Sequence, residues 1–150
     1  MTSLESVTLE MPDPTASNAS LTAAFGVVTR VGVRAPDGAI WKVATSSKRD
    51  TGPATRQVDD VVLLLGVEDV KASKRFYVDR GLTVAKSFGS KYVEFESPAT
   101  HVKLALYGRR AAAKDAGVPP EGTGSHRIVL GSDTGPFTDP DGFAWEAASV

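Results

Sequence analysis

Glu146 is the clearest candidate in this sequence for a chemical role, because it ends the second of two copies of one motif. The copies, residues 36–42 and 140–146, share Pro-Asp-Gly-x-x-Trp and differ in the residue after the tryptophan: Lys42 in the first, Glu146 in the second. A carboxylate can bind a metal ion, whereas an ammonium group cannot. A reactive site is therefore expected in the second copy, and the first copy is expected to serve packing, pairing or cavity closure.

The composition limits both the chemistry and the partners of the chain. Cysteine is absent, so disulfides, zinc–thiolate sites and thiol nucleophiles are excluded, and a metal ion would need His101, His126 and carboxylates. The net charge of −1 provides no basic surface for nucleic acid or an anionic membrane. No apolar run approaches the roughly 18 residues of a membrane span, and no signal-peptide pattern is present. We therefore expect a cytoplasmic protein without nucleic-acid or membrane partners.

The elements that position these residues follow a pattern that starts twice. The first start predicts strands over residues 7–11, 27–33 and 39–45, a helix over 15–24 and then a polar linker. The second start is an almost wholly apolar strand over residues 61–67, which is expected to be buried on both faces.

Asp69 is expected to cap a helix that runs to about Arg80 and has Val70, Ser73 and Tyr77 along one side. The elements predicted after it are strands over residues 83–87, 91–96, 102–107, 126–132 and 143–148, a helix over 109–116 and a Pro/Gly loop over 118–125.

Two segments carry a family resemblance. Residues 73–81 read Ser-Lys-Arg-Phe-Tyr-Val-Asp-Arg-Gly, and residues 139–146 read Asp-Pro-Asp-Gly-Phe-Ala-Trp-Glu. With the strand before them, they resemble the vicinal oxygen chelate superfamily, which contains glyoxalase I, extradiol dioxygenases and bleomycin-resistance proteins. The resemblance implies an α+β fold in which βαβββ modules pair into a curved mixed sheet around a cavity.

The same resemblance implies the domain organisation. The first copy is much shorter between Asp13 and Pro36 than the second is between Asp69 and Pro140, so the first module is abridged. The expected organisation is an abridged βαββ module at residues 1–47, a linker at 48–56 and the main module pair at 57–150.

The resemblance further implies a metal site. Carried over position by position, it assigns Asp60, His126 and Glu146 as ligands of Mn²⁺, Fe²⁺ or Zn²⁺, with Glu146 also catalytic. Leu104 stands near the position where glyoxalase I has a glutamate, so that enzyme's four-ligand set is incomplete here. The metal would chelate vicinal oxygens of a small substrate and act as a Lewis acid, as in a lyase or dioxygenase. No organic cofactor is implied.

A plainer interpretation stands beside the metal site. Asp60 can be a solvated residue at a strand start, His126 a hydrogen-bonding residue near a strand, and Glu146 a polar lining residue. The Pro-Asp-Gly turns have a structural explanation, because proline restricts φ, aspartate bonds its own turn and glycine accepts positive φ.

Under that interpretation the chain is a non-enzymatic small-molecule- or antibiotic-binding protein of the bleomycin-resistance type. Tyr92, Leu104 and Tyr107 are then expected to bind the ligand. The aromatic residues expected to line the cavity or fill the core are Phe88, Tyr92, Phe95, Tyr107, Phe137 and Trp145. A homodimer is also expected to be feasible, since an abridged module leaves unpaired sheet edges that recruit partners.

Overall fold

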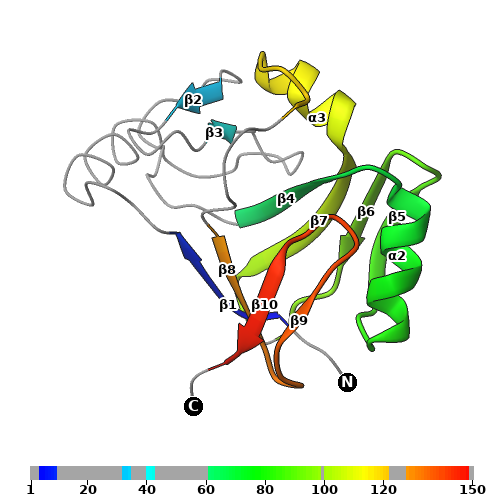
Figure 1. The fold of residues 1–150 in the computed structure, drawn as a ribbon, viewed down its shortest axis with the longest axis vertical. Coiled ribbons are helices and arrows are strands. Elements are labelled where there is room, and N and C mark those ends of the chain that lie inside the picture. Colours follow the sequence, from blue (N-terminus) through cyan, green and yellow to red (C-terminus); the bar gives the residue numbers. More distant parts are fainter. Residues whose placement is uncertain are drawn as a thin grey trace, which may run out of the picture. The chain divides into compact units, whose positions relative to one another are not determined.

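The computed structural model describes residues 4–9, 32–34, 40–42, 61–98, 100–121 and 128–148 (Figure 1). The chain divides into two compact units, one formed by Met1–Leu9 with Asp60–Val150 and the other by Glu10–Asp59. Neither described helix is long and apolar enough to cross a membrane.

The smaller unit contains an antiparallel pair of strands, β2 (Gly32–Arg34) and β3 (Ile40–Lys42). The Trp41-Lys42 end of the first motif copy lies in β3, and the Trp145-Glu146 end of the second lies in β10 (Ala144–Ala147). Both copies of the motif therefore lead into a strand, as predicted. The helix predicted over residues 15–24 lies outside the described residues.

A complete βαβββ module forms the centre of the larger unit. Its elements are β4 (Val61–Val67), α2 (Val70–Asp79), β5 (Val84–Phe88), β6 (Tyr92–Phe95) and β7 (Val102–Gly108). The strand order is β4-β7-β6-β5, with β4 parallel to β7 and the other neighbours antiparallel (Figure 1). The α+β class and the βαβββ topology predicted from the sequence are confirmed.

Helix α2 begins and ends where the sequence predicts. The side chain of Asp69 accepts hydrogen bonds from the backbone N–H groups of Lys71 (2.9 Å) and Ala72 (3.1 Å), which caps the free donors of the first turn. Gly81 follows the helix with a φ of 100°, a conformation that glycine adopts without a steric penalty. The predicted buried side of the helix, Val70, Ser73 and Tyr77, is buried.

The second four-stranded sheet is a module with parts missing. It contains β1 (Leu4–Leu9), β8 (Ile128–Ser132), β9 (Phe137–Thr138) and β10, in the order β1-β8-β10-β9, and α3 (Arg109–Ala116) precedes β8 in the chain. β8 runs parallel to β10, and β10 runs antiparallel to β9. In a complete βαβββ module the first strand likewise runs parallel to the last, and the last runs antiparallel to the third, so β8, β10 and β9 correspond to the first, last and third strands.

Strand β1 places the start of the chain in the larger unit. It pairs antiparallel with β8, from Leu9 opposite Ile128 to Leu4 opposite Ser132. The compact units therefore divide after Leu9 and again near Asp60, whereas the sequence-based organisation divides the chain at residues 48–56. The difference arises because pairing between distant strands joins segments that the order of motifs separates.

The core lies between α2, one face of the β4-β7-β6-β5 sheet and the second sheet. Its largest fully buried side chains include Trp145, Tyr77, Phe95, Leu65, Leu104, Leu106 and Leu130. The ring of Tyr77 on α2 lies 5.7 Å from Phe95 on β6 and 5.7 Å from Trp145 on β10, between ring centroids. One helix thus connects both sheets.

Strand β4 corrects one expectation. Residues 61–67 are predicted to be buried on both faces, but Leu65 is 1% exposed while Leu64 is 45% exposed. Successive side chains of a strand point to opposite faces, and the fully buried side chains of β4, Leu65 and Val67, lie on the face toward α2. The prediction is wrong because an apolar run does not reveal which face a partner element covers.

Candidate functional site

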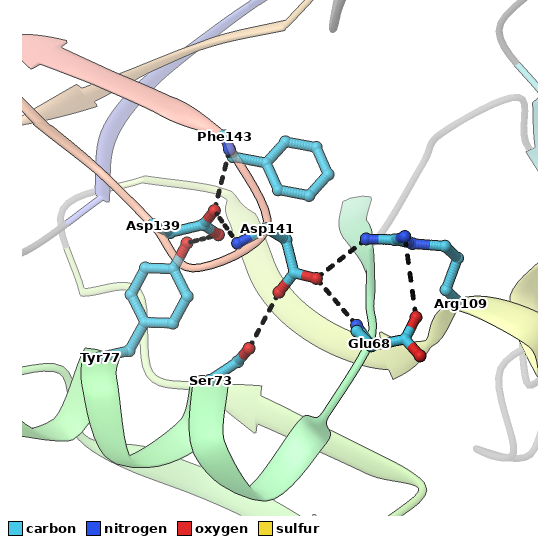
Figure 2. A network of polar contacts seen from close by, with 7 residues as sticks. All are labelled: Glu68, Ser73, Tyr77, Arg109, Asp139, Asp141 and Phe143. Carbon is cyan, nitrogen blue, oxygen red and sulfur yellow. Dashed lines mark hydrogen bonds and ion pairs between the residues drawn. The ribbon is translucent and has the colours of Figure 1, made fainter. Parts of the chain in front are cut away.

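Asp139 ties the second Pro-Asp-Gly turn to helix α2 (Figure 2). One of its carboxylate oxygens accepts a hydrogen bond of 2.6 Å from the hydroxyl of Tyr77, and the other accepts from the backbone N–H groups of Asp141 (2.9 Å) and Phe143 (2.8 Å). The indole N–H of Trp145 donates to the same tyrosine hydroxyl at 3.2 Å. Asp139 is buried, and these donors compensate the cost of removing its carboxylate from water.

Asp141 makes a second set of bonds from the same turn (Figure 2). Its Oδ1 accepts from the backbone N–H of Glu68 (2.8 Å) and from Nη2 of Arg109 (3.0 Å), and its Oδ2 accepts from the hydroxyl of Ser73 (3.0 Å). Arg109 also lies 3.7 Å from the carboxylate of Glu68. The turn is therefore joined to the end of β4, to α2 and to the start of α3.

These contacts give the turn residues a structural role. Both aspartates of the motif are occupied by donors from the protein itself, which agrees with the structural interpretation of the Pro-Asp-Gly turn. Trp145 is buried and Glu146 is exposed, as strand alternation requires.

A second group of side chains lies on the face of the β4-β7-β6-β5 sheet that is turned away from α2, called the distal face below. Register and alternation define its members, because paired residues of neighbouring strands share a face. The distal face carries Val62, Leu64 and Gly66 from β4, Lys103, Ala105 and Tyr107 from β7, Tyr92 and Glu94 from β6, and Lys86 and Phe88 from β5.

Three aromatic rings form one row across the distal face. The ring centroids of Phe88 and Tyr92 are 6.1 Å apart, and those of Tyr92 and Tyr107 are 6.4 Å apart. Gly66 occupies the fourth place in the row, and Arg109 lies over it, since a β-carbon built on Gly66 would lie 3.6 Å from the Cα of Arg109. Phe88 is 63% exposed, so a large apolar surface at the end of this row faces solvent.

The adjacent row contains charged and small side chains. Its order across the sheet is Lys86, Glu94, Ala105 and Leu64. Glu94 accepts a hydrogen bond of 2.8 Å from the hydroxyl of Tyr92, and its other oxygen lies 3.6 Å from Nζ of Lys86. The distal face therefore combines exposed apolar side chains with an acidic residue, Glu94, that is only 6% exposed, and Ala105 beside it is fully buried.

An open depression of about 450 Å³ lies beside Tyr107, where β7 passes into α3. Its lining residues are Glu68, Ser90, Lys91, Tyr107, Gly108, Arg109, Arg110 and Ala111. The hydroxyl of Tyr107 donates to Asp115 on α3 at 2.8 Å, which holds the ring at the rim. The depression therefore lies next to the Tyr107 end of the aromatic row.

Hydrogen bonds to carboxylates raise the pKa of every tyrosine in the structure. Burial raises the pKa of Tyr77 and Tyr92, and the carboxylates of Asp139 and Glu94 that accept their protons raise it further. For the more exposed Tyr107 the hydrogen bond to Asp115 is the main cause of the raised pKa. Each hydroxyl acts as a hydrogen-bond donor, and its ionisation would place a phenolate next to a carboxylate, so that two negative charges would repel each other.

The residues predicted from the sequence fall into three groups. Tyr92 and Tyr107 lie together on the distal face. Leu104 lies on the opposite face and is fully buried in the core. It pairs with Leu63, and its side chain points away from that of Ala105, the next residue of the strand, which lies on the distal face. Glu146 is exposed on β10.

Asp60 and His126, the other two predicted metal ligands, lie outside the described residues. Within residues 61–98, 100–121 and 128–148, no group of three or more His, Asp and Glu side chains is arranged to hold a metal ion. The metal site therefore stays a prediction, with Glu146 as its one described member.

Sequence reasoning missed Glu94, Lys86 and Ala105. Alternation alone contains the signal: Glu94 stands two residues after Tyr92, and Ala105 two residues before Tyr107, so each shares a face with a tyrosine. The pairing of Glu94 with Ala105 requires the strand register, which no local pattern provides.

Comparisons with known proteins place the fold in context. No model of a protein family matches the sequence, and no curated protein matches it. Among solved structures, the chain is similar to a protein described as a glyoxalase-related enzyme from Fulvimarina pelagi, with 22% sequence identity and a TM-score of 0.48, over 63% of this chain and 88% of the other. A likeness of this extent carries no activity, metal or ligand over to this chain.

The raised pKa values predict an unusual alkaline titration. Since the chain has three tyrosines and all three have raised pKa values, near-ultraviolet absorbance should show little tyrosinate in the folded protein at about pH 10, where free tyrosine is half ionised. The tyrosine hydrogen bonds contribute fully to the free energy of unfolding below that pH. This contribution is lost as the pH rises through the tyrosine pKa values of the folded protein, because the unfolded chain releases its tyrosine protons first. The urea-unfolded chain is the control. Half-ionisation of the folded protein near pH 10 would contradict the hydrogen-bonded arrangement.

Proposed function

We propose that the chain is a small-molecule-binding protein of the bleomycin-resistance type within the vicinal oxygen chelate superfamily, and that its ligand lies on the distal face. The observation that carries the proposal is the aromatic row of Phe88, Tyr92 and Tyr107 beside the charged row that contains Glu94.

The surface chemistry supports this proposal. Binding sites for small molecules combine apolar and aromatic surface with a few polar groups that orient the ligand. Phe88, Leu64 and Val62 leave large apolar side chains exposed on one face, whereas the other face of the same sheet is closely packed. Exposed apolar side chains that gather on one surface, next to a buried carboxylate, favour a ligand site over an ordinary solvated face.

Catalysis at a metal is the second candidate function. It is supported by the exposed carboxylate of Glu146, which strand alternation directs away from the buried Trp145. With Asp60 and His126 it would supply one imidazole and two carboxylates, a ligand set suited to Mn²⁺, Fe²⁺ or Zn²⁺. A metal bound there would supply Lewis-acid chemistry for a chelated substrate. The homodimer and the cytoplasmic location expected from the sequence stay predictions.

Phe88→Ala tests the binding proposal. We expect saturable binding of the neutral dye N-phenyl-1-naphthylamine, followed by its fluorescence, and a loss of affinity of roughly three- to tenfold in Phe88→Ala, because one ring of the aromatic row is removed. Val78→Ala is the matched control, since Val78 is also an exposed apolar residue but lies on α2. Absence of saturable binding, or an equal loss in both variants, would contradict the proposal.

Elemental analysis tests the metal proposal. Protein purified without a histidine tag and then equilibrated with Mn²⁺, Fe²⁺ or Zn²⁺ should retain stoichiometric metal, and Glu146→Gln should lose it while folding normally by circular dichroism. Glu121→Gln, at an exposed carboxylate in the loop after α3, serves as the control. Metal retained equally by all three proteins, or by none of them, excludes Glu146 as a ligand.

A further inference from the structure

The depression at the start of α3 carries an excess of positive charge. The charged side chains in its lining are Lys91, Arg109, Arg110 and Glu68. The whole chain has a net charge of −1, so this excess is a property of the depression and not of the composition. Cations that gather on a concave surface focus a positive potential there, which attracts an anion.

Contacts within the protein already neutralise one of these cations. Nη2 of Arg109 lies 3.0 Å from Oδ1 of Asp141, and its Nη1 lies 3.7 Å from the carboxylate of Glu68 (Figure 2). The single acidic residue of the lining is therefore paired as well. Among the residues that the structure describes, Lys91 and Arg110 have no ion-pair partner. These two side chains supply the positive charge that a ligand could use.

The backbone brings Lys91 and Arg110 to the same end of the sheet. Tyr92 pairs with Tyr107, and the backbone N–H of Gly108 donates to the carbonyl of Lys91 at 3.3 Å, which extends the pairing by one residue. Arg110 follows in the first turn of α3. Both cations are exposed, so their charged ends can reach a ligand without disturbing the core.

Tyr107 connects the depression with the aromatic row. Its ring lines the depression and lies 6.4 Å from the ring of Tyr92, while its hydroxyl donates to Asp115. Ser90 adds a hydroxyl group to the lining. The volume of about 450 Å³ is within the range of small-molecule sites. A ligand with a ring on the aromatic row can therefore extend a charged substituent past Tyr107 into the depression.

We infer that the depression binds an anionic group of the ligand, a carboxylate or a phosphate, and that Lys91 and Arg110 are the specificity-determining residues that select it. The inference rests on the proposed binding function and adds the chemical class of the ligand. A guanidinium can bind either anion through two parallel hydrogen bonds, and an ammonium acts as a point charge. Because both side chains are exposed, salt screens these interactions and the gain in affinity is modest.

Four probes test this inference in NMR titrations of the full chain. 1-Naphthyl phosphate, 1-naphthol and 1-naphthylmethylamine share one ring system and carry an anionic, a neutral and a cationic substituent, whereas inorganic phosphate is the anion without the ring. We expect 1-naphthyl phosphate to bind about fivefold more tightly than 1-naphthol at low ionic strength, and 1-naphthylmethylamine to bind most weakly. Inorganic phosphate should bind more weakly than the ester because it does not contact the aromatic row. About 0.5 M NaCl should remove most of the advantage of the ester.

A pair of double variants tests the residues. Lys91→Gln with Arg110→Gln should abolish the difference between 1-naphthyl phosphate and 1-naphthol and leave the affinity for 1-naphthol unchanged. Lys114→Gln with Arg75→Gln is the matched control, since it removes the same charge from exposed positions outside the lining, and it should retain the difference. Circular dichroism checks that both variants fold. An equal effect of the two double variants would contradict the roles of Lys91 and Arg110.

The outcomes separate the inference from the proposed function. Equal affinity for the three ring probes, or the tightest binding for 1-naphthylmethylamine, would overturn the inference and leave a face that binds rings without regard to charge. Inorganic phosphate that binds as tightly as 1-naphthyl phosphate would also overturn it, because the anion would then bind independently of the aromatic row. Absence of binding by every probe, together with absence of N-phenyl-1-naphthylamine binding, would overturn both.

Discussion

The hydrogen bond between the Tyr77 hydroxyl and the Asp139 carboxylate, at 2.6 Å, is the contact on which the arrangement of the larger unit depends. It joins residues 62 positions apart and brings together α2, the β9–β10 turn and the indole of Trp145. A charged acceptor at a buried position makes the bond directional and costly to leave unpaired. Both sheets can share one core because this contact sets where the second sheet meets the helix.

The two faces of the β4-β7-β6-β5 sheet differ in composition. The side toward α2 holds the close-packed aliphatic and aromatic core, and its composition is explained by burial alone. The distal face has exposed apolar residues, an aromatic row and a buried carboxylate, which burial alone does not explain. Strand alternation lets adjacent residues such as Leu65, which is 1% exposed, and Leu64, which is 45% exposed, serve the two purposes independently.

Much of the fold was accessible from the sequence, because local signals specified it. Asp69 and Gly81 mark the ends of α2, the helix predicted over residues 109–116 matches α3, and the repeated motif leads into β3 and β10. Each of these signals acts within a few residues, through capping, periodicity or turn chemistry.

What the sequence did not reveal depends on contacts between distant segments. The apolar run of β4 concealed its exposed face, the two-residue strand β9 exists only through pairing with β10, and β1 joins β8 across most of the chain. The candidate site follows the same rule: the sequence predicts Tyr92 and Tyr107 as ligand-binding residues, whereas the position of Glu94 opposite Ala105 requires the register between β6 and β7. Leu104 was placed by analogy of position, and alternation directs it into the core.

Methyl NMR spectra recorded while N-phenyl-1-naphthylamine is added test the division of the sheet most directly. Val62 and Leu64 report on the distal face, where they are 40% and 45% exposed, and Leu104 and Leu65 report on the core face of the same sheet. If the distal face binds the ligand, the methyl signals of Val62 and Leu64 shift with saturation while those of Leu104 and Leu65 stay nearly unchanged. Saturable shifts confined to the core face or to α2, or no saturable shift at Val62 and Leu64, would contradict a ligand site on the distal face.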